Sequence, residues 1–251
     1  MTKENKKRYY ATTRPYNRVP HPHLSFKVGK WLVKSAFPKH KVVFEQPPEA
    51  DEQAIFVANH AKAYGPLVMM LRFPVKARPW VISNVCFSRT FPAFAMQDFW
   101  HPKNKFTRAL YWVLSYALVP VARWVFLGIE AIPAYFDRNS HITVKKSVQT
   151  LKEDLSIVLF PENRTPYSEY NEDFSSGFIF VARRYYKETG KKLKFYPVYA
   201  CPKNRVIHVG RPVQYDPAQD FRTHQEDIKN YLRDDMTRIA RQLGAPPTYE
   251  K

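Results

Sequence analysis

A histidine that could move a proton follows a short apolar run in this sequence. His60, preceded by Asn59, comes directly after residues 54–58 (AIFVA), whose residue types favour a β-strand. Ligands of open parallel sheets bind beyond the carboxyl ends of the strands, and a histidine there can act as a general base. A histidine at a strand end can equally be a hydrogen-bonded structural group, so His60 alone does not decide between these interpretations.

A second polar cluster follows another apolar run. Residues 156–160 (SIVLF) predict a strand, and Pro-Glu-Asn-Arg-Thr follows at residues 161–165. An arginine such as Arg164 can bind a phosphate group, and a nearby carboxylate such as Glu162 can hold the arginine in place. If both strands belong to one parallel sheet, the two clusters project from the same edge and form one site.

The pattern of elements predicts the sheet that would position these clusters. From residue 140 a helix with one apolar face precedes the strand 156–160, and further elements alternate along the chain: a helix near 177–188, strands at 194–200 and 205–209, and a last helix from about Thr223. Thr223 and Glu226 resemble a capping box, and Gly244 is expected to end that helix. This alternation predicts an α/β fold, a single domain with a central, mostly parallel sheet flanked by helices.

The basic charge is concentrated before this domain. The chain of 251 residues carries a formal charge of +18, and residues 1–41 hold eleven Lys/Arg against Glu4, so this segment contributes +10. Residues 24–37 predict a helix with Leu24, Val28, Trp31 and Leu32 on one face and lysines beside them. Such a helix is typical of a membrane surface, although an ordinary helix packed on the core has the same pattern. We therefore expect a basic membrane-associating arm at 1–41 and an α/β domain at 42–251.

The segment 110–128 is the most apolar part of the chain. It follows a strand predicted at 80–85 and contains one charge, Arg123, and one proline, Pro120. Its length approaches the ~20 residues that span a bilayer. A central arginine and a proline favour instead a buried or membrane-grazing helix pair that is broken at Pro120.

Several classes of protein are disfavoured by the same sequence. Cys86 and Cys201 are far apart and suggest neither a disulfide framework nor a zinc site, which favours a reducing, cytoplasmic setting. The polar N-terminus does not resemble a secretory signal. A glycine-rich phosphate loop and an RNA-binding signature are missing, although the basic, tyrosine-containing arm would suit RNA as an unspecific partner.

The order of several sequence blocks resembles the glycerolipid acyltransferases of the lysophosphatidic acid acyltransferase type. Residues 57–66 (VANHAKAYGP) resemble the family's first block, N-H-x-x-x-x-D, and residues 159–165 (LFPENRT) resemble its third block, F-P-E-G-T-R-S. Residues 173–184, 195–200 and 208–213 are similar to the blocks that follow. The resemblance implies acyl transfer with His60 as catalytic base, and with Asn59, Arg138, Glu162 and Arg164 as substrate-binding residues. Lys62 and Tyr64, inside the first block, face either the donor's phosphates or solvent.

The departures from the family pattern bear on activity. The position of the first-block aspartate is Gly65, so His60 lacks the carboxylate that orients it in the family. In hydrolase triads the loss of such an acid costs about 10⁴-fold in rate. Another acceptor would then have to orient His60, for example a backbone carbonyl or Asp98. An aspartate in place of Gly65 would complete the pair if the backbone here matches that of the family.

The resemblance implies a specific enzymatic activity. We expect an O-acyltransferase that moves a fatty acyl group from acyl-CoA or acyl carrier protein to the hydroxyl of a lysophospholipid or glycerol phosphate, with no metal or other cofactor. The expected location is the cytoplasmic face of the membrane, with peripheral attachment to its anionic surface. Two alternatives stay open: an inactive relative that binds anionic lipid, and, less favoured, a nucleic-acid-binding protein.

Overall fold

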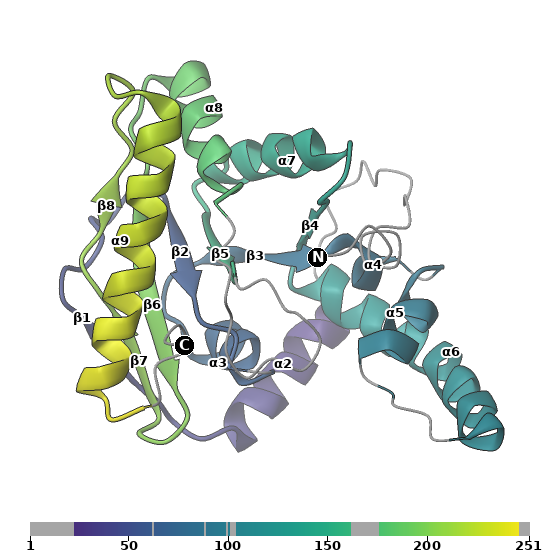
Figure 1. The fold of residues 1–251 in the computed structure, drawn as a ribbon. Helices are drawn as coiled ribbons and strands as arrows, with labels where there is room; N and C mark the ends of the chain where they lie inside the picture. The colour runs from purple at the N-terminus through teal and green to yellow at the C-terminus, as the bar shows by residue number, and fades with distance from the viewer. Residues whose placement is uncertain are drawn as a thin grey trace. The chain divides into compact units, whose positions relative to one another are not determined.

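The structure is a computed structural model that describes residues 23–61, 63–87, 89–98, 100, 104–161 and 176–245. It confirms the α/β fold. The strands form an eight-stranded, mostly parallel sheet in the order β1-β7-β6-β2-β5-β3-β4, with β8 pairing β6 (Figure 1). Strand β6 pairs antiparallel with β7 and with β8. The strands are β1 (Lys41–Phe44), β2 (Ala54–Ala58), β3 (Ala77–Ile82), β4 (Ile132–Ala134), β5 (Ser156–Leu159), β6 (Lys194–Cys201), β7 (Val206–Val209) and β8 (Val213–Gln214).

The helices lie before, between and after these strands. They are α2 (Leu24–Ala36), α3 (Tyr64–Arg72), α4 (Ser83–Cys86), α5 (Phe91–Asp98), α6 (Lys105–Gly128), α7 (Ser140–Lys152), α8 (Ile179–Thr189) and α9 (Phe221–Gln242). The chain divides into two compact units. Pro79–Thr143 and the described residues up to Gly29 form unit 1, and Lys30–Arg78 with the described residues from Val144 onward form unit 2.

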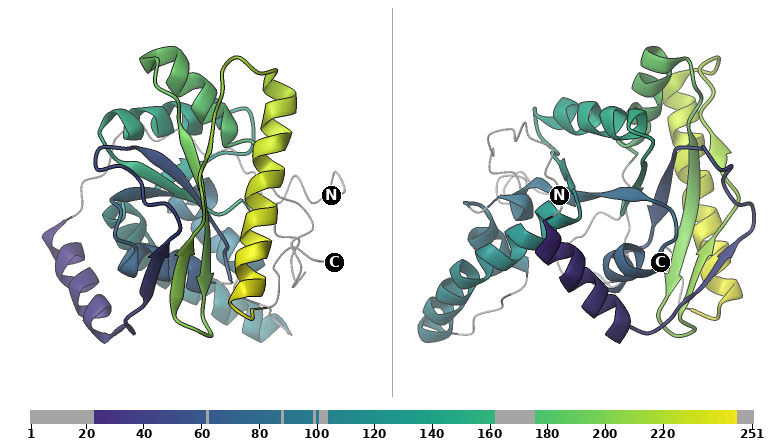
Figure 2. Two further views of the ribbon diagram at one scale, coloured as in Figure 1. Left: turned by 90° about the vertical axis from the view of Figure 1, so that its left-hand side faces the viewer. Right: turned by 180° about the vertical axis from the view of Figure 1, so that it is seen from behind.

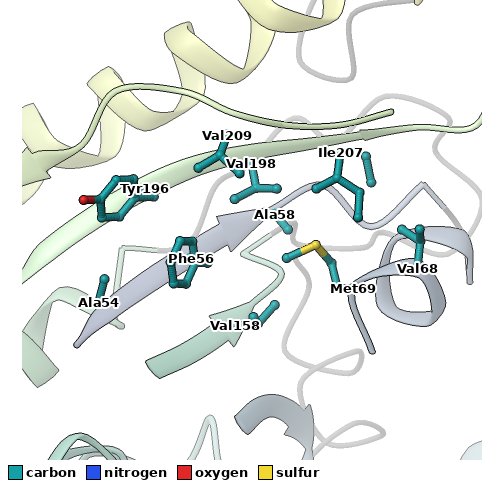
Figure 3. Packing of buried hydrophobic residues seen from close by; sticks show 11 residues of the cluster. Ala54, Phe56, Ala58, Val68, Met69, Val158, Tyr196, Val198, Ile207 and Val209 are labelled. Carbon is teal, nitrogen blue, oxygen red and sulfur yellow. The ribbon is translucent and has the colours of Figure 1, made fainter. Parts of the chain in front are cut away.

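The core of unit 2 is built on strands that are buried on both faces. All five residues of β2 are buried, as a central parallel strand requires. Even-numbered residues of β2 and β6 pack with α3, in a cluster that includes Phe56, Met69 and Tyr196 (Figure 3). On the other face Tyr199 and Cys201 of β6 pack against Ile239 and Ala240 of α9. Figure 2 shows α9 running along the strands β6 and β7.

Unit 1 contains the paired strands β3 and β4 and the helices between them. Trp80, Val81 and Ile82 of β3 pair in parallel with Ile132, Pro133 and Ala134 of β4. Helix α5 packs on α6 through a cluster that includes Phe91, Phe94, Val119 and Phe126. Among the described helices, α6 alone is long and apolar enough to cross a bilayer by length and composition.

Three local predictions need correction. The strand predicted at 80–85 begins at Ala77 and ends at Ile82, because the next residues turn into α4. The segment 110–128 is not a broken pair, since α6 continues through Pro120. The last helix begins at Phe221, and Asp220 rather than Thr223 is its N-cap, with the Thr223 amide donating to Asp220 Oδ2 at 3.0 Å. Gly244 ends the helix with a left-handed φ of 61°, as predicted.

Candidate active site

His60 lies immediately beyond the carboxyl end of β2, where the sequence predicted it. Strand β2 is central, with β5 and β6 as parallel neighbours. The imidazole is half-buried, and its ring centroid lies 5.3 Å from that of Phe160, the residue that follows β5. Phe160 was not singled out from the sequence, where it only marked the end of an apolar run. His60 is therefore held beside the end of the neighbouring strand and keeps an exposed part.

The two predicted clusters do start from one edge of the sheet. Val57 of β2 is in register with Leu159 of β5, and the strands run parallel. The residues that follow them, Asn59 and His60 on one strand and Phe160 and Pro161 on the other, therefore leave the sheet at the same end. Glu162 and Arg164 come next in the chain but lie outside the described residues, so binding of a phosphate by Arg164, with Glu162 holding the arginine, stays a prediction.

Asn59 is turned into the protein. Its side chain is 1% exposed. The Asn59 amide nitrogen Nδ2 donates to the carbonyl of Ala200 at 3.2 Å, and the Ala200 amide donates back to Asn59 Oδ1 at 2.7 Å. This pair of hydrogen bonds ties the end of β2 to β6 and so fixes the backbone that carries His60. The structure gives Asn59 this positioning contact, and its predicted contact with substrate is not tested.

Gly65 packs against the turn that carries His60. The Gly65 amide donates to the His60 carbonyl at 3.0 Å, and Ala61 between them has a left-handed φ of 41°. A Cβ atom at position 65 would lie 2.2 Å from the carbonyl oxygen of Asn59 and 2.7 Å from that of His60. Both neighbours are backbone atoms, which cannot rotate away. The condition under which an aspartate at 65 would complete the pair with His60 is therefore not met in this backbone.

Tyr64 takes part in a hydrogen-bond network inside unit 2. The sequence suggested instead that it faces the donor's phosphates or solvent. Its hydroxyl lies 2.5 Å from Nε2 of His40 and donates to the carbonyl of Cys201 at 3.4 Å. Burial raises the pKa of Tyr64, and the nearby Cys201 raises it further. Tyr64 thus links the first turn of α3 to β6 and to the segment before β1. Lys62, the other residue considered in this block, lies outside the described residues.

Arg138, also predicted to bind substrate, lies on the exposed loop between β4 and α7. Its backbone carbonyl lies 2.8 Å from Nδ1 of His141. Arg138 belongs to unit 1, whereas His60 belongs to unit 2, so the contact of Arg138 with substrate stays a prediction. The side chain of Asp98, considered above as a substitute acid, lies outside what the structure describes.

Comparison with known proteins identifies the fold. A scan against protein-family models and a search of curated proteins each found no match. Four chains among the solved structures match. One is the crystal structure of the 1-acyl-sn-glycerophosphate (LPA) acyltransferase PlsC from Thermotoga maritima, with a TM-score of 0.50 and 14% identity over 90% of this chain and 80% of that chain. At this level of identity the likeness shows a shared fold.

Proposed function

We propose that this chain is an acyltransferase that moves a fatty acyl group from a thioester, acyl-CoA or acyl carrier protein, to the hydroxyl of a lysophospholipid or glycerol phosphate. The observation that carries the proposal is the position of His60 at the end of β2, beside the end of β5 that leads to Glu162 and Arg164. The fold shared with an acyltransferase supports it.

The reaction balances with a base and two substrates. A ring nitrogen of His60 takes the proton of the acceptor hydroxyl, and the oxygen attacks the thioester carbonyl. The tetrahedral intermediate then breaks its C–S bond, and the thiolate leaves with the electron pair and takes the proton back from the imidazolium. Because a thiolate is a good leaving group, the step needs no metal or redox cofactor.

Phosphate recognition is assigned to the basic residues of the predicted site. Arg164, held by Glu162, would bind the phosphate of the acceptor or donor by charge-assisted hydrogen bonds, and Arg138 is kept as a proposed substrate-binding residue. The proposed place of action is the cytoplasmic face of the membrane, because the acceptor and product of such a reaction reside in the bilayer. The basic arm 1–41 would contribute peripheral attachment to an anionic surface.

The position of Gly65 bears on the rate of this reaction. An acid at this position is excluded by contact with two backbone carbonyls, so His60 must act without it. By comparison with triads that lose their orienting acid, we expect turnover roughly 10⁴-fold below that of a complete pair. The competing function is an inactive relative that binds anionic lipid.

A substrate panel tests the proposal. Purified full-length protein is incubated with acyl-CoA or acylated carrier protein and with lysophosphatidic acid, neutral lysophospholipid or glycerol 3-phosphate, and the acylated product is identified by mass spectrometry. We expect one phosphate-bearing acceptor to be acylated, and Arg164→Ala to raise the KM for it at least tenfold. Absence of any acylated product, together with retained binding to anionic vesicles, would instead identify the inactive relative.

A further inference from the structure

Within the part of the chain that the structure describes, helix α6 has an apolar face that stays exposed along its length. Its large apolar side chains on this face are between 37% and 78% exposed: Phe106, Leu110, Val113, Val121 and Trp124. At 3.6 residues per turn these positions lie on one side of the helix. The opposite side packs on α5 through residues such as Val119 and Phe126. Exposed apolar residues in so continuous a stripe mark an interaction surface.

Helix α2 extends this surface. The ring of Phe26 packs edge-on against Trp124 with centroids 5.2 Å apart, and Trp124 Nε1 donates to Ser25 Oγ at 3.1 Å. Phe26 also packs on Gly128, where a Cβ atom would lie 2.2 Å from the phenyl ring. The two helices are thus held together, while Leu24 and Val28 of α2 stay exposed.

The charges beside this surface indicate what covers it. Helix α6 contains Lys105, Arg108 and Arg123 and no acidic residue, and Lys105 and Arg123 lie on the same side because they are about five turns apart. A second copy of a chain with charge +18 would repel the first. An anionic lipid leaflet complements both the apolar stripe and its basic border.

The connections of α6 to the sheet show that this helix does not cross the bilayer as a single span. The chain leaves the sheet at Ile82 of β3 and returns at Ile132 of β4, and these strands are parallel neighbours. Both ends of the intervening segment are therefore on one side of a membrane, and a crossing by α6 would require a second crossing by residues 83–104. That stretch carries Arg89, Asp98, His101 and Lys103, which makes it unsuitable as a span.

We propose that α6, together with the first half of α2, lies flat in one anionic leaflet, with the Phe106–Trp124 stripe among the upper acyl chains and the basic residues at the phosphates. This proposal deepens the membrane location proposed above by naming the element that inserts. It is independent of the acyl-transfer chemistry.

Vesicle flotation of the full-length protein tests the role of the stripe. The variant Leu110→Ala, Val113→Ala and Val121→Ala removes apolar area while raising helix propensity, so the helix should persist, as circular dichroism can verify. We expect its partition coefficient on vesicles of phosphatidylcholine and phosphatidylglycerol to fall at least tenfold. The control Phe180→Ala removes a 44% exposed side chain from α8 and should bind as the wild type does. Equal binding of all three proteins would overturn the proposal.

The depth of three labelled positions tests the orientation of α6. Environment-sensitive dyes are placed at Phe106→Cys, Val113→Cys and Val121→Cys in a Cys86→Ser background and quenched by spin-labelled lipids. If the helix lies flat, all three dyes are quenched most by labels near the glycerol end of the acyl chain. A dye at 113 that is quenched most by labels near the chain's methyl end, with 106 and 121 shallow, would show a span. Dyes that respond to protein concentration but not to vesicles would show a second copy as the occupant. Either result contradicts the proposal, and turnover measured on detergent-dispersed acceptor separates it from the proposed reaction.

Discussion

The close contact between Gly65 and the backbone of Asn59 and His60 excludes an acidic side chain at position 65 that could orient the His60 imidazole. A side chain at 65 would push on two carbonyl oxygens that are themselves fixed, one by the Gly65 amide and the other by the strand end that Asn59 ties to β6. The glycine is therefore a packing requirement of the turn, and the missing acid is a consequence of that packing.

Gly65→Ala and Gly65→Asp are both expected to destabilise the protein, because forcing atoms into a filled site costs about 1–3 kcal/mol or more. Thermal unfolding should show Tm lowered by several degrees, more for aspartate than for alanine. Gly190→Ala is the matched control: the position has a φ of 71° but nothing within 4 Å of its Cβ, so only the backbone cost of about 1–2 kcal/mol applies. A Gly65→Asp protein as stable as the wild type and more active would show that this account of the turn is wrong.

The elements are joined by polar contacts whose strength depends on pH. Glu45, directly after β1, accepts hydrogen bonds from Arg238 Nη2 of α9 at 2.7 Å and from His208 Nε2 of β7 at 3.1 Å. Burial alone would raise the pKa of Glu45, but the hydrogen bonds from Arg238 and His208 outweigh it and lower the pKa. A carboxylate with a lowered pKa stabilises the folded state above its ordinary pKa, and this contribution is lost as the pH falls through the folded-state value.

Glu45→Gln should therefore lower the free energy of unfolding at pH 7, and the difference from wild type should shrink as the pH falls below the ordinary carboxyl pKa of about 4.5. Urea unfolding at a series of pH values measures it. A difference that stays constant over this range would mean that Glu45 acts through packing alone.

Helix α6 has a proline in its interior, and the packing of α6 on α5 offsets the loss of stability that the proline causes. Pro120 cannot donate the helical hydrogen bond to the carbonyl of Tyr116, and its ring crowds the preceding turn, at a cost of roughly 3 kcal/mol. Contacts on both sides of it hold the helix together: Trp100 Nε1 donates to Ser115 Oγ at 2.8 Å, and Ala122 packs on the α5 cluster.

Pro120→Ala should stabilise the protein, by up to about 2 kcal/mol once the greater freedom of the unfolded alanine chain is subtracted. Chemical denaturation monitored by circular dichroism would show it. A loss of stability would mean that the proline sets a bend on which the packing of α5 depends.

The sequence was sufficient for much of the molecule where hydrophobic pattern decides the structure. The buried run 54–58 is β2 with the predicted bounds, and the placement of His60 at its end follows from it. The alternation after residue 140 predicted β5, α8, β6 and β7 closely. These elements are specified by local periodicity, which a single sequence displays.

The rest depended on contacts between residues far apart in the chain. Pro120 suggested a break in the helix because the low helix propensity of proline is a local property. The packing of α6 on α5, which keeps the helix continuous, involves residues distant in the chain. Asp220, and not Thr223, is the N-cap of α9. Both residue types can cap a helix, so the sequence pattern could not decide between them. The tight approach of Gly65 to Asn59, and the hydrogen bond between Tyr64 and His40, exist only once the strands and α3 are assembled.

The rate of product formation by His60→Ala tests most directly whether His60 is the base of an acyl transfer. The control is His23→Ala, since His23 is exposed and its backbone carbonyl accepts hydrogen bonds from the Phe26 and Lys27 amides, which the substitution leaves in place. With the best donor and acceptor of the panel, we predict that kcat/KM falls at least 10²-fold in His60→Ala and is unchanged in His23→Ala, with both variants folded. A His60→Ala protein that forms the acylated product at the wild-type rate would contradict the account.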